Sequence, residues 1–137
     1  TARFLDWWKS SGLTCKWTTA AMDDASQNGQ VETLEWWNRS GLTCRYSNLS
    51  IHWASSNGCI AVLDWWRTSG LPLKMDYPVD EASKQGNIAV LEWFKNSGLR
   101  FPWSSWSMDW ASGFGHVEVL EWWKNSGLTC KWSRDWL

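Results

Sequence analysis

The chain has 137 residues, with 13 Lys and Arg against 14 Asp and Glu, a formal net charge of -1 and a pI near 6.0. This balance argues against a protein that holds the phosphate backbone of a nucleic acid or an anionic membrane surface. No apolar run reaches the roughly 18 residues of a membrane-spanning helix. With 44% hydrophobic residues the composition favours a folded protein, and its unusual feature is the 16 tryptophans.

Two glycine series divide the chain into repeats, the feature to look for before local structure. A Ser-Gly-Leu tripeptide recurs at intervals of 29, 29, 28 and 29 residues, and a second glycine precedes its glycine by 12 residues in each complete unit. The pattern predicts a single repeat array over residues 1–137, with about four and a half to five units. The units end at Gly12, Gly41, Gly70, Gly98 and Gly127, and the second series is Gly29, Gly58, Gly86 and Gly115.

A long helix is expected between each second-series glycine and the next unit end, as over residues 116–127, and the chain opens in such a helix that ends at Gly12. Apolar residues cover more than half of this helix's circumference, so neighbours must cover it on two sides. The closing glycine suits a left-handed residue that stops the helix. Acids precede bases in each long helix, an order that predicts ion pairs such as Asp64 with Arg67 and Glu35 with Arg39.

A shorter helix is expected before each second-series glycine. It begins near a polar N-cap and buries one apolar residue and, three positions later, an alanine. The N-caps are Thr18, Ser47, Asp76, Ser104 and Ser133, the apolar residues are Met22, Ile51, Val79 and Met108, and the alanines are Ala25, Ala54, Ala82 and Ala111. No segment alternates as a strand would. The fold class predicted is all-α, a solenoid of helix pairs.

Paired aromatic residues recur in the long helices, nine tryptophans and Phe94. Equivalent indoles of stacked helices form columns, and we interpret these columns as core between the units. A column that stacks sugars or bases is the alternative. Trp53 and Trp110 differ, because the equivalent residues in other units are Asp24 and Glu81. A position that accepts both tryptophan and an acid is not essential core, so surface recognition is an equal possibility there.

The repeat resembles the ankyrin family. Residues 111–127 read Ala-Ser-x-x-Gly-His-Val-Glu-Val-Leu-Glu-Trp-Trp-Lys-Asn-Ser-Gly, which is similar to the family's helix pair, and the likeness recurs along the whole chain. The resemblance implies a structural, backbone-bonding role for His116, and Pro78 stands at the place of the family's turn proline. The family's unit is about 33 residues long. The shorter unit here predicts brief extended connectors in place of full β-hairpins, and other helix-pair solenoids are the structural alternative.

Both ends of the chain resemble interrupted units. Thr1 aligns with His116 and Leu137 aligns with Met108, so we interpret the chain as a segment of a longer solenoid. Solenoids require polar caps on their terminal repeats. Neither end resembles such a cap, because several apolar residues there are expected to face outward, namely Phe4, Trp7, Trp8, Trp132 and Trp136.

Little in the sequence points to chemistry. Cys15, Cys44 and Cys130 share one repeat position with Leu73 and Phe101, which predicts buried thiols, and equivalent positions about 10 Å apart are too distant for a disulfide. The two histidines occupy different positions, and every glycine belongs to a helix end. We therefore expect no metal, no cofactor and no catalysis, and reduced cysteines favour an intracellular, cytoplasmic setting.

Variation between the units indicates where a partner binds. Core positions barely change, whereas several short-helix positions differ in every copy, and recognition lies on such sites of a fixed scaffold. The function predicted is a scaffold that binds another protein through the short-helix face. The candidate partner-binding residues are Asp24, Gln27, His52, Trp53, Asp80, Glu81, Lys84, Asp109, Trp110 and Phe114.

Two alternatives remain open. Half-units at both ends predict end-to-end self-association as a structural element. A cation row of Lys16, Arg45, Lys74 and Lys131 would suit a reader of single nucleotides. We favour instead that these cations neutralise helix carbonyl ends or the row of Asp23, Asp80 and Asp109, and the overall charge argues against nucleic acid.

Overall fold

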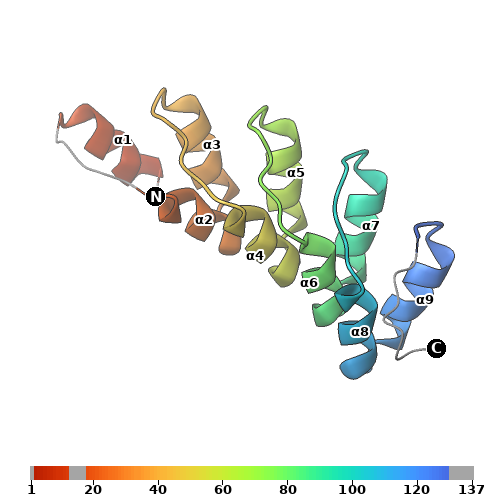
Figure 1. Ribbon diagram of the computed structural model, residues 1–137. Helices are drawn as coiled ribbons and strands as arrows, with labels where there is room; N and C mark the ends of the chain where they lie inside the picture. The colour runs from red at the N-terminus through yellow and green to blue at the C-terminus, as the bar shows by residue number, and fades with distance from the viewer. Residues whose placement is uncertain (1, 13–17, 130–137) are drawn as a thin grey trace.

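The computed structural model describes residues 2–12 and 18–129, and within them the chain forms nine α-helices and no strand (Figure 1). The all-α class predicted from the repeat is confirmed. The helices are α1 (Ala2–Ser10), α2 (Ala20–Gln27), α3 (Val31–Arg39), α4 (Leu49–Asn57), α5 (Ile60–Thr68), α6 (Pro78–Gln85), α7 (Ile88–Asn96), α8 (Trp106–Gly113) and α9 (Val117–Asn125).

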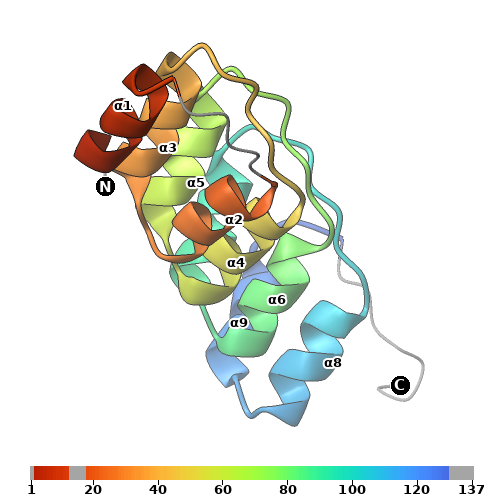
Figure 2. The same cartoon turned by 90° about the vertical axis from the view of Figure 1, so that its left-hand side faces the viewer.

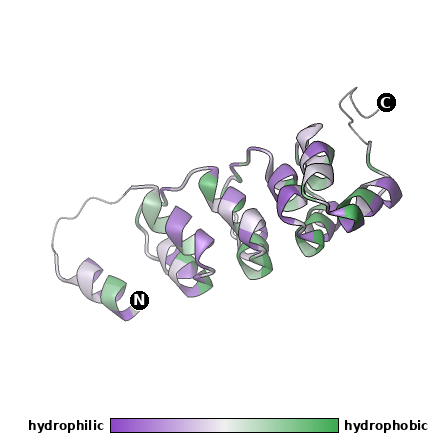
Figure 3. Ribbon diagram, turned by 90° about the horizontal axis from the view of Figure 1, so that it is seen from below, coloured by the Kyte–Doolittle hydropathy of each residue, from purple (hydrophilic) through white to green (hydrophobic). Residues whose placement is uncertain are grey.

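The helices stand in two rows that together make a curved, elongated stack (Figure 1). Helices α1, α3, α5, α7 and α9 pack in succession in one row, and α2, α4, α6 and α8 pack in succession in the other. Each even-numbered helix also packs on the odd-numbered helix that follows it. In Figure 2 the α2–α8 row lies in front and the connectors run along one side of the stack. Purple and green mix on most helices in Figure 3, as expected of elements with one polar and one apolar side.

The predicted core positions of the short helices are confirmed, since Met22, Ile51, Val79 and Met108 and their four partner alanines are all buried. The expectation of unequal helices is wrong. The helices of the first row have nine residues and those of the second row eight or nine. The second-row helices begin two residues after the predicted N-caps, because the hydroxyls of Thr18, Ser47 and Ser104 accept hydrogen bonds from the backbone N–H two residues later, at 3.1–3.2 Å.

The Ser-Gly-Leu tripeptide stops each long helix by a specific set of bonds. At the end of α5 the Ser69 hydroxyl donates to the Trp66 carbonyl at 2.9 Å and accepts from the Leu71 N–H at 3.2 Å. Gly70 follows with φ of 81°, a left-handed conformation that other residues avoid. The same pair of serine bonds closes α3, α7 and α9. The connectors that follow contain no strand within the described residues, as expected for units without hairpins.

The second aromatic of each pair lies in the core, as predicted for Trp37, Trp66, Phe94 and Trp123, while Trp8 is half-buried. The two indoles of a pair pack edge to face, for example Trp65 and Trp66 with ring centroids 4.9 Å apart. Near the start of the chain Phe4 and Trp7 face outward, as expected. Trp132 and Trp136, together with Cys15, Lys16, Cys130, Lys131 and Ser133, lie outside the described residues.

Candidate functional site

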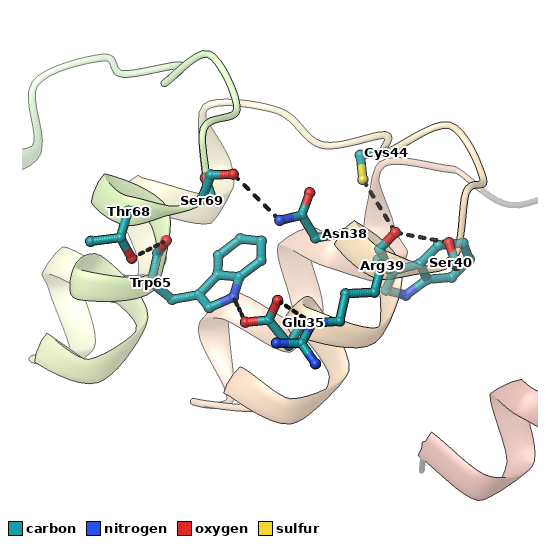
Figure 4. Close-up of polar contacts among 9 residues, drawn as sticks. Glu35, Asn38, Arg39, Ser40, Cys44, Trp65, Thr68 and Ser69 are labelled. Atoms are coloured by element: carbon teal, nitrogen blue, oxygen red, sulfur yellow. Dashed lines mark hydrogen bonds and ion pairs between the residues drawn. The ribbon is translucent and has the colours of Figure 1, made fainter.

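The first tryptophan of the pairs in α3, α5, α7 and α9 donates a hydrogen bond to an acid of the preceding unit. The indole Nε1 of Trp65 donates to Glu35 Oε2 at 3.1 Å, and that of Trp93 donates to Asp64 Oδ1 at 2.7 Å (Figure 4 shows the first pair). Trp36 and Trp122 bond the acids Asp6 and Glu92 in the same way, each at 2.5 Å. The acids of α1, α5 and α7 therefore bind the next helix rather than a base of their own.

The ion pairs predicted within the long helices are mostly wrong. Glu35 and Arg39 form one at 3.2 Å, with Arg39 exposed, whereas Asp64 forms none with Arg67 in the described structure. Lysine and asparagine at a neighbouring position reach across the units instead. Lys9 Nζ donates to the Ser40 carbonyl. Asn38 Nδ2 donates to the Ser69 carbonyl at 3.4 Å (Figure 4).

The buried row of short-helix acids is structural. Asp23 accepts the backbone N–H of Ser47 at 2.9 Å and the hydroxyls of Ser47 and Ser50 at 2.5 and 2.7 Å. Asp80 receives the same three bonds from Ser104 and Ser107 of the next unit. Asp80 is only 3% exposed, and all three of these donors come from its own chain.

His52 occupies the same position in α4 but makes a different contact. Its Nδ1 lies 3.0 Å from Asp76 Oδ2, and Asp76 stands where the other units have Ser47 and Ser104. At this boundary the carboxylate belongs to the later unit, whereas at the other two it belongs to the earlier unit. The second oxygen of this carboxylate, Oδ1, is buried without a hydrogen-bond partner.

The connectors form a further set of contacts that the sequence interpretation missed. Tyr46 donates its hydroxyl to the Pro72 carbonyl at 2.5 Å, and Lys74 donates to the Tyr46 carbonyl at 3.1 Å while its ammonium lies 4.5 Å from the Tyr46 ring centroid. Lys74 therefore binds a connector, not a helix end or the acid row. Cys44 is half-buried rather than fully buried, and its burial raises the pKa of the thiol. Burial also raises the pKa of the Tyr46 hydroxyl, and the charge of Cys44 raises it further.

A cleft of about 470 Å³ opens on the short-helix row and collects the charged and aromatic residues of three units. Tyr77 and Trp106 are 51% and 55% exposed at the starts of α6 and α8, and the Trp106 and Trp110 rings lie 5.2 Å apart. The lining residues are His52, Asp76, Tyr77, Asp80, Glu81, Ser104, Trp106 and Trp110. Such a concave mixture of rings and a few polar groups is the usual form of a binding site.

The structure brings some of the predicted site residues together and separates others. His52, Glu81 and Trp110 line the cleft, as does Asp80 with its buried carboxylate. Trp53 packs edge to face on His52, and the Lys84 ammonium lies 5.0 Å from the Trp110 ring centroid. Trp53 and Lys84 therefore lie next to the cleft and are not lining residues. The other four do not line it either, and these are Asp24 and Gln27 of α2, Asp109 of α8, and Phe114 after α8.

Tyr77 and Trp106 belong to the site and were missed, as was exposed Leu49 on the same face. Each stands four residues before the variable position of its unit, on the same side of the helix, and the equivalent residue of the first unit is Ala20. Apolar size that varies between the units at an i−4 position was the available signal.

Comparison with family models, curated proteins and solved structures found no match for this chain.

Two structural findings bear on other kinds of site. No described helix has the length and apolar character needed to cross a bilayer. Within residues 2–12 and 18–129 no three His, Cys, Asp or Glu side chains gather as metal ligands would.

Proposed function

We propose that the chain is an ankyrin-like solenoid that serves as a scaffold, binding a partner protein through its short-helix face. The two rows of stacked helix pairs, their regular units and the lack of strands in the described parts of the connectors support the architecture. The proposal assigns the protein no catalytic reaction and no cofactor. The free thiols of Cys44 and Cys59 support an intracellular, cytoplasmic setting.

The observation that carries this proposal is the cleft itself. Large aromatic side chains stand exposed on neighbouring helices there, while the same helices bury their alanines in the core. Exposed apolar patches with a polar rim are typical of protein interaction sites, and tryptophan and tyrosine are the residues that most often anchor a partner. Because hydrogen bonds between the units hold the scaffold, a partner meets a preorganised surface.

The double substitution Trp53→Ser and Trp110→Ser tests whether these rings belong to the surface. Trp53 is 36% exposed and Trp110 is half-buried, so we expect the free energy of unfolding to fall by about 1 kcal/mol, as for surface changes. The matched control is Trp123→Ser in the core, where a loss of roughly 3–5 kcal/mol is expected. Denaturant unfolding measures both. A similar loss in the two variants would assign Trp53 and Trp110 to the core.

Binding is tested with peptides selected from a phage-displayed random library against the intact chain. Peptides that use the short-helix face lose affinity for the double variant and keep it for Glu118→Ala, a control at an exposed residue of α9. Selected peptides that bind all three proteins equally would contradict the proposal.

End-to-end self-association is the second candidate, and the Trp–acid bonds between units favour it. Trp7 is equivalent to the four tryptophans that donate to the preceding unit and is 59% exposed, and Glu121 is equivalent to the acids that accept and is exposed too. A second copy could join Trp7 to Glu121 and continue the stack. Sedimentation at rising concentration tests this: association that Glu121→Ala abolishes supports it, and a monomer at all concentrations refutes it.

A further inference from the structure

We infer that the cleft receives a cationic side chain, a lysine ammonium or an arginine guanidinium, from the partner. This inference rests on the proposed function, since it names the chemistry of the group that enters the proposed binding site. It follows from the charges, the rings and the unused acceptors that line the cleft.

The charges of the lining residues are the first argument. The cleft is lined by Asp76, Asp80 and Glu81 and by no lysine or arginine. Asp80 is used by its three serine donors, but Glu81 is half-buried and forms no ion pair in the described structure. Asp76 shares one oxygen with His52 and has no hydrogen-bond partner for the other. Glu81 therefore has acceptor capacity that a cationic donor can use, while the Asp76 carboxylate contributes negative charge to the same cleft.

The aromatic walls are the second argument. A cation within about 6 Å of an aromatic centroid is attracted by the ring, most strongly by tryptophan. The Lys84 ammonium of the same chain already lies 5.0 Å from the Trp110 ring centroid. Trp106 and Tyr77 are exposed at the same cleft and add two further rings.

Other occupants fit less well. An acidic side chain would be repelled by Glu81 and Asp76, since like charges disfavour an interface. An apolar side chain would pack on the rings but would remove water from Glu81 without supplying a donor, and a desolvated, unpaired carboxylate is costly. A guanidinium or ammonium satisfies both the rings and the acids, and an arginine can also bind a carboxylate with two hydrogen bonds.

The test uses blocked tripeptides, Gly-Lys-Gly and Gly-Arg-Gly, with Gly-Glu-Gly and Gly-Leu-Gly as comparisons. NMR follows the indole N–H resonances of Trp106 and Trp110, assigned from the spectra of Trp106→Phe and Trp110→Phe. We expect both basic peptides to shift these resonances at millimolar concentration, with a weaker effect at high salt. Glu81→Gln should lower the affinity about tenfold, because it removes a charge but keeps the shape. Glu118→Gln, the matched control on α9, should leave it unchanged.

The outcomes separate this inference from the proposed function. If Gly-Leu-Gly or Gly-Glu-Gly shifts the two resonances as strongly, the cleft binds but does not select a cation, and only the inference is overturned. A lack of shift with both basic peptides overturns it as well. If library-selected peptides bind the protein without shifting Trp106 or Trp110, the inference and the proposed binding face are both overturned.

Discussion

Alanine in place of Ser26, Ser55 or Ser83 makes one chemical change at three equivalent buried positions, yet the expected results differ. Trp66 Nε1 donates to the Ser26 hydroxyl at 3.0 Å, and Trp123 Nε1 donates to the Ser83 hydroxyl at the same distance. In the unit between them Phe94 replaces the tryptophan, and the Ser55 hydroxyl is buried without a hydrogen-bond partner. Ser55 is therefore present although no indole N–H is available at position 94 to donate to its hydroxyl.

The magnitudes follow from the hydrogen bonds. Ser26→Ala or Ser83→Ala leaves a buried indole N–H without an acceptor, which costs about 1–3 kcal/mol of unfolding free energy. Ser55→Ala removes an unsatisfied hydroxyl, so its effect should be near zero or stabilising. Urea unfolding followed by far-ultraviolet circular dichroism measures the three variants, with midpoints compared at unchanged slope. If Ser55→Ala destabilises as much as Ser26→Ala, the reasoning is refuted.

A double-mutant cycle tests the same pair in the reverse direction. Phe94→Trp restores the indole N–H that Ser55 lacks, but the larger ring costs packing energy of its own. Comparing Phe94→Trp in the wild type and in the Ser55→Ala background cancels that cost. The expected coupling is favourable by about 1 kcal/mol, the usual net value of one hydrogen bond. A coupling of zero would mean that the two side chains do not meet.

Three further predictions concern the unit boundaries and the thiols. Gly86→Ala should destabilise the fold by about 1–3 kcal/mol more than Gly115→Ala. Both glycines have φ near 75°, but only at Gly86 would the new methyl lie 3.0 Å from an imidazole of the next unit. Equal losses of unfolding free energy in urea would contradict this. Asp64→Ala should cost about 1 kcal/mol, and Asp64→Asn less, because the amide oxygen still accepts the indole N–H; the same assay checks the order. The raised pKa of Cys44 keeps this thiol protonated at pH values where an ordinary thiol ionises. Its alkylation, followed residue by residue by mass spectrometry, should therefore rise only at higher pH than that of a model thiol. The stability that the protonated thiol contributes is lost as the pH rises through the raised pKa.

The all-α class and the helix ends at the Ser-Gly-Leu tripeptides could be predicted because the residues that stop a helix have local chemistry. A serine hydroxyl beside a left-handed glycine bonds only backbone groups of its own turn, as Ser69 does before Leu71. The Ser-Gly-Leu tripeptide therefore ends a helix wherever it occurs. The buried row of alanines was equally readable, since helical spacing alone places it. These features need no knowledge of neighbouring units.

Contacts between units could not be predicted from one helix at a time. Asp64 and Arg67 have the spacing of an ion pair, yet the carboxylate binds Trp93 of the next unit, because stacking places that indole beside it. Helical spacing describes neighbours along a helix and is silent about neighbours one repeat later. The cleft was missed as a whole for the same reason: Tyr77 and Trp106 become its walls only once α6 and α8 are packed side by side.

The column of Asp23, His52 and Asp80 shows how variation in a repeat protein should be interpreted. Taken alone, a histidine in a row of acids indicates a recognition site, but the opposite residue changes with it, from serine to Asp76. Each boundary has a polar contact with one carboxylate, which lies in the earlier unit at Asp23 and Asp80 and in the later unit at Asp76. The change to His52 is therefore compensated structurally by the change to Asp76. Glu81 varies without an ion-pair or hydrogen-bond partner across the boundary, and for that reason it is the stronger candidate for contact with another molecule.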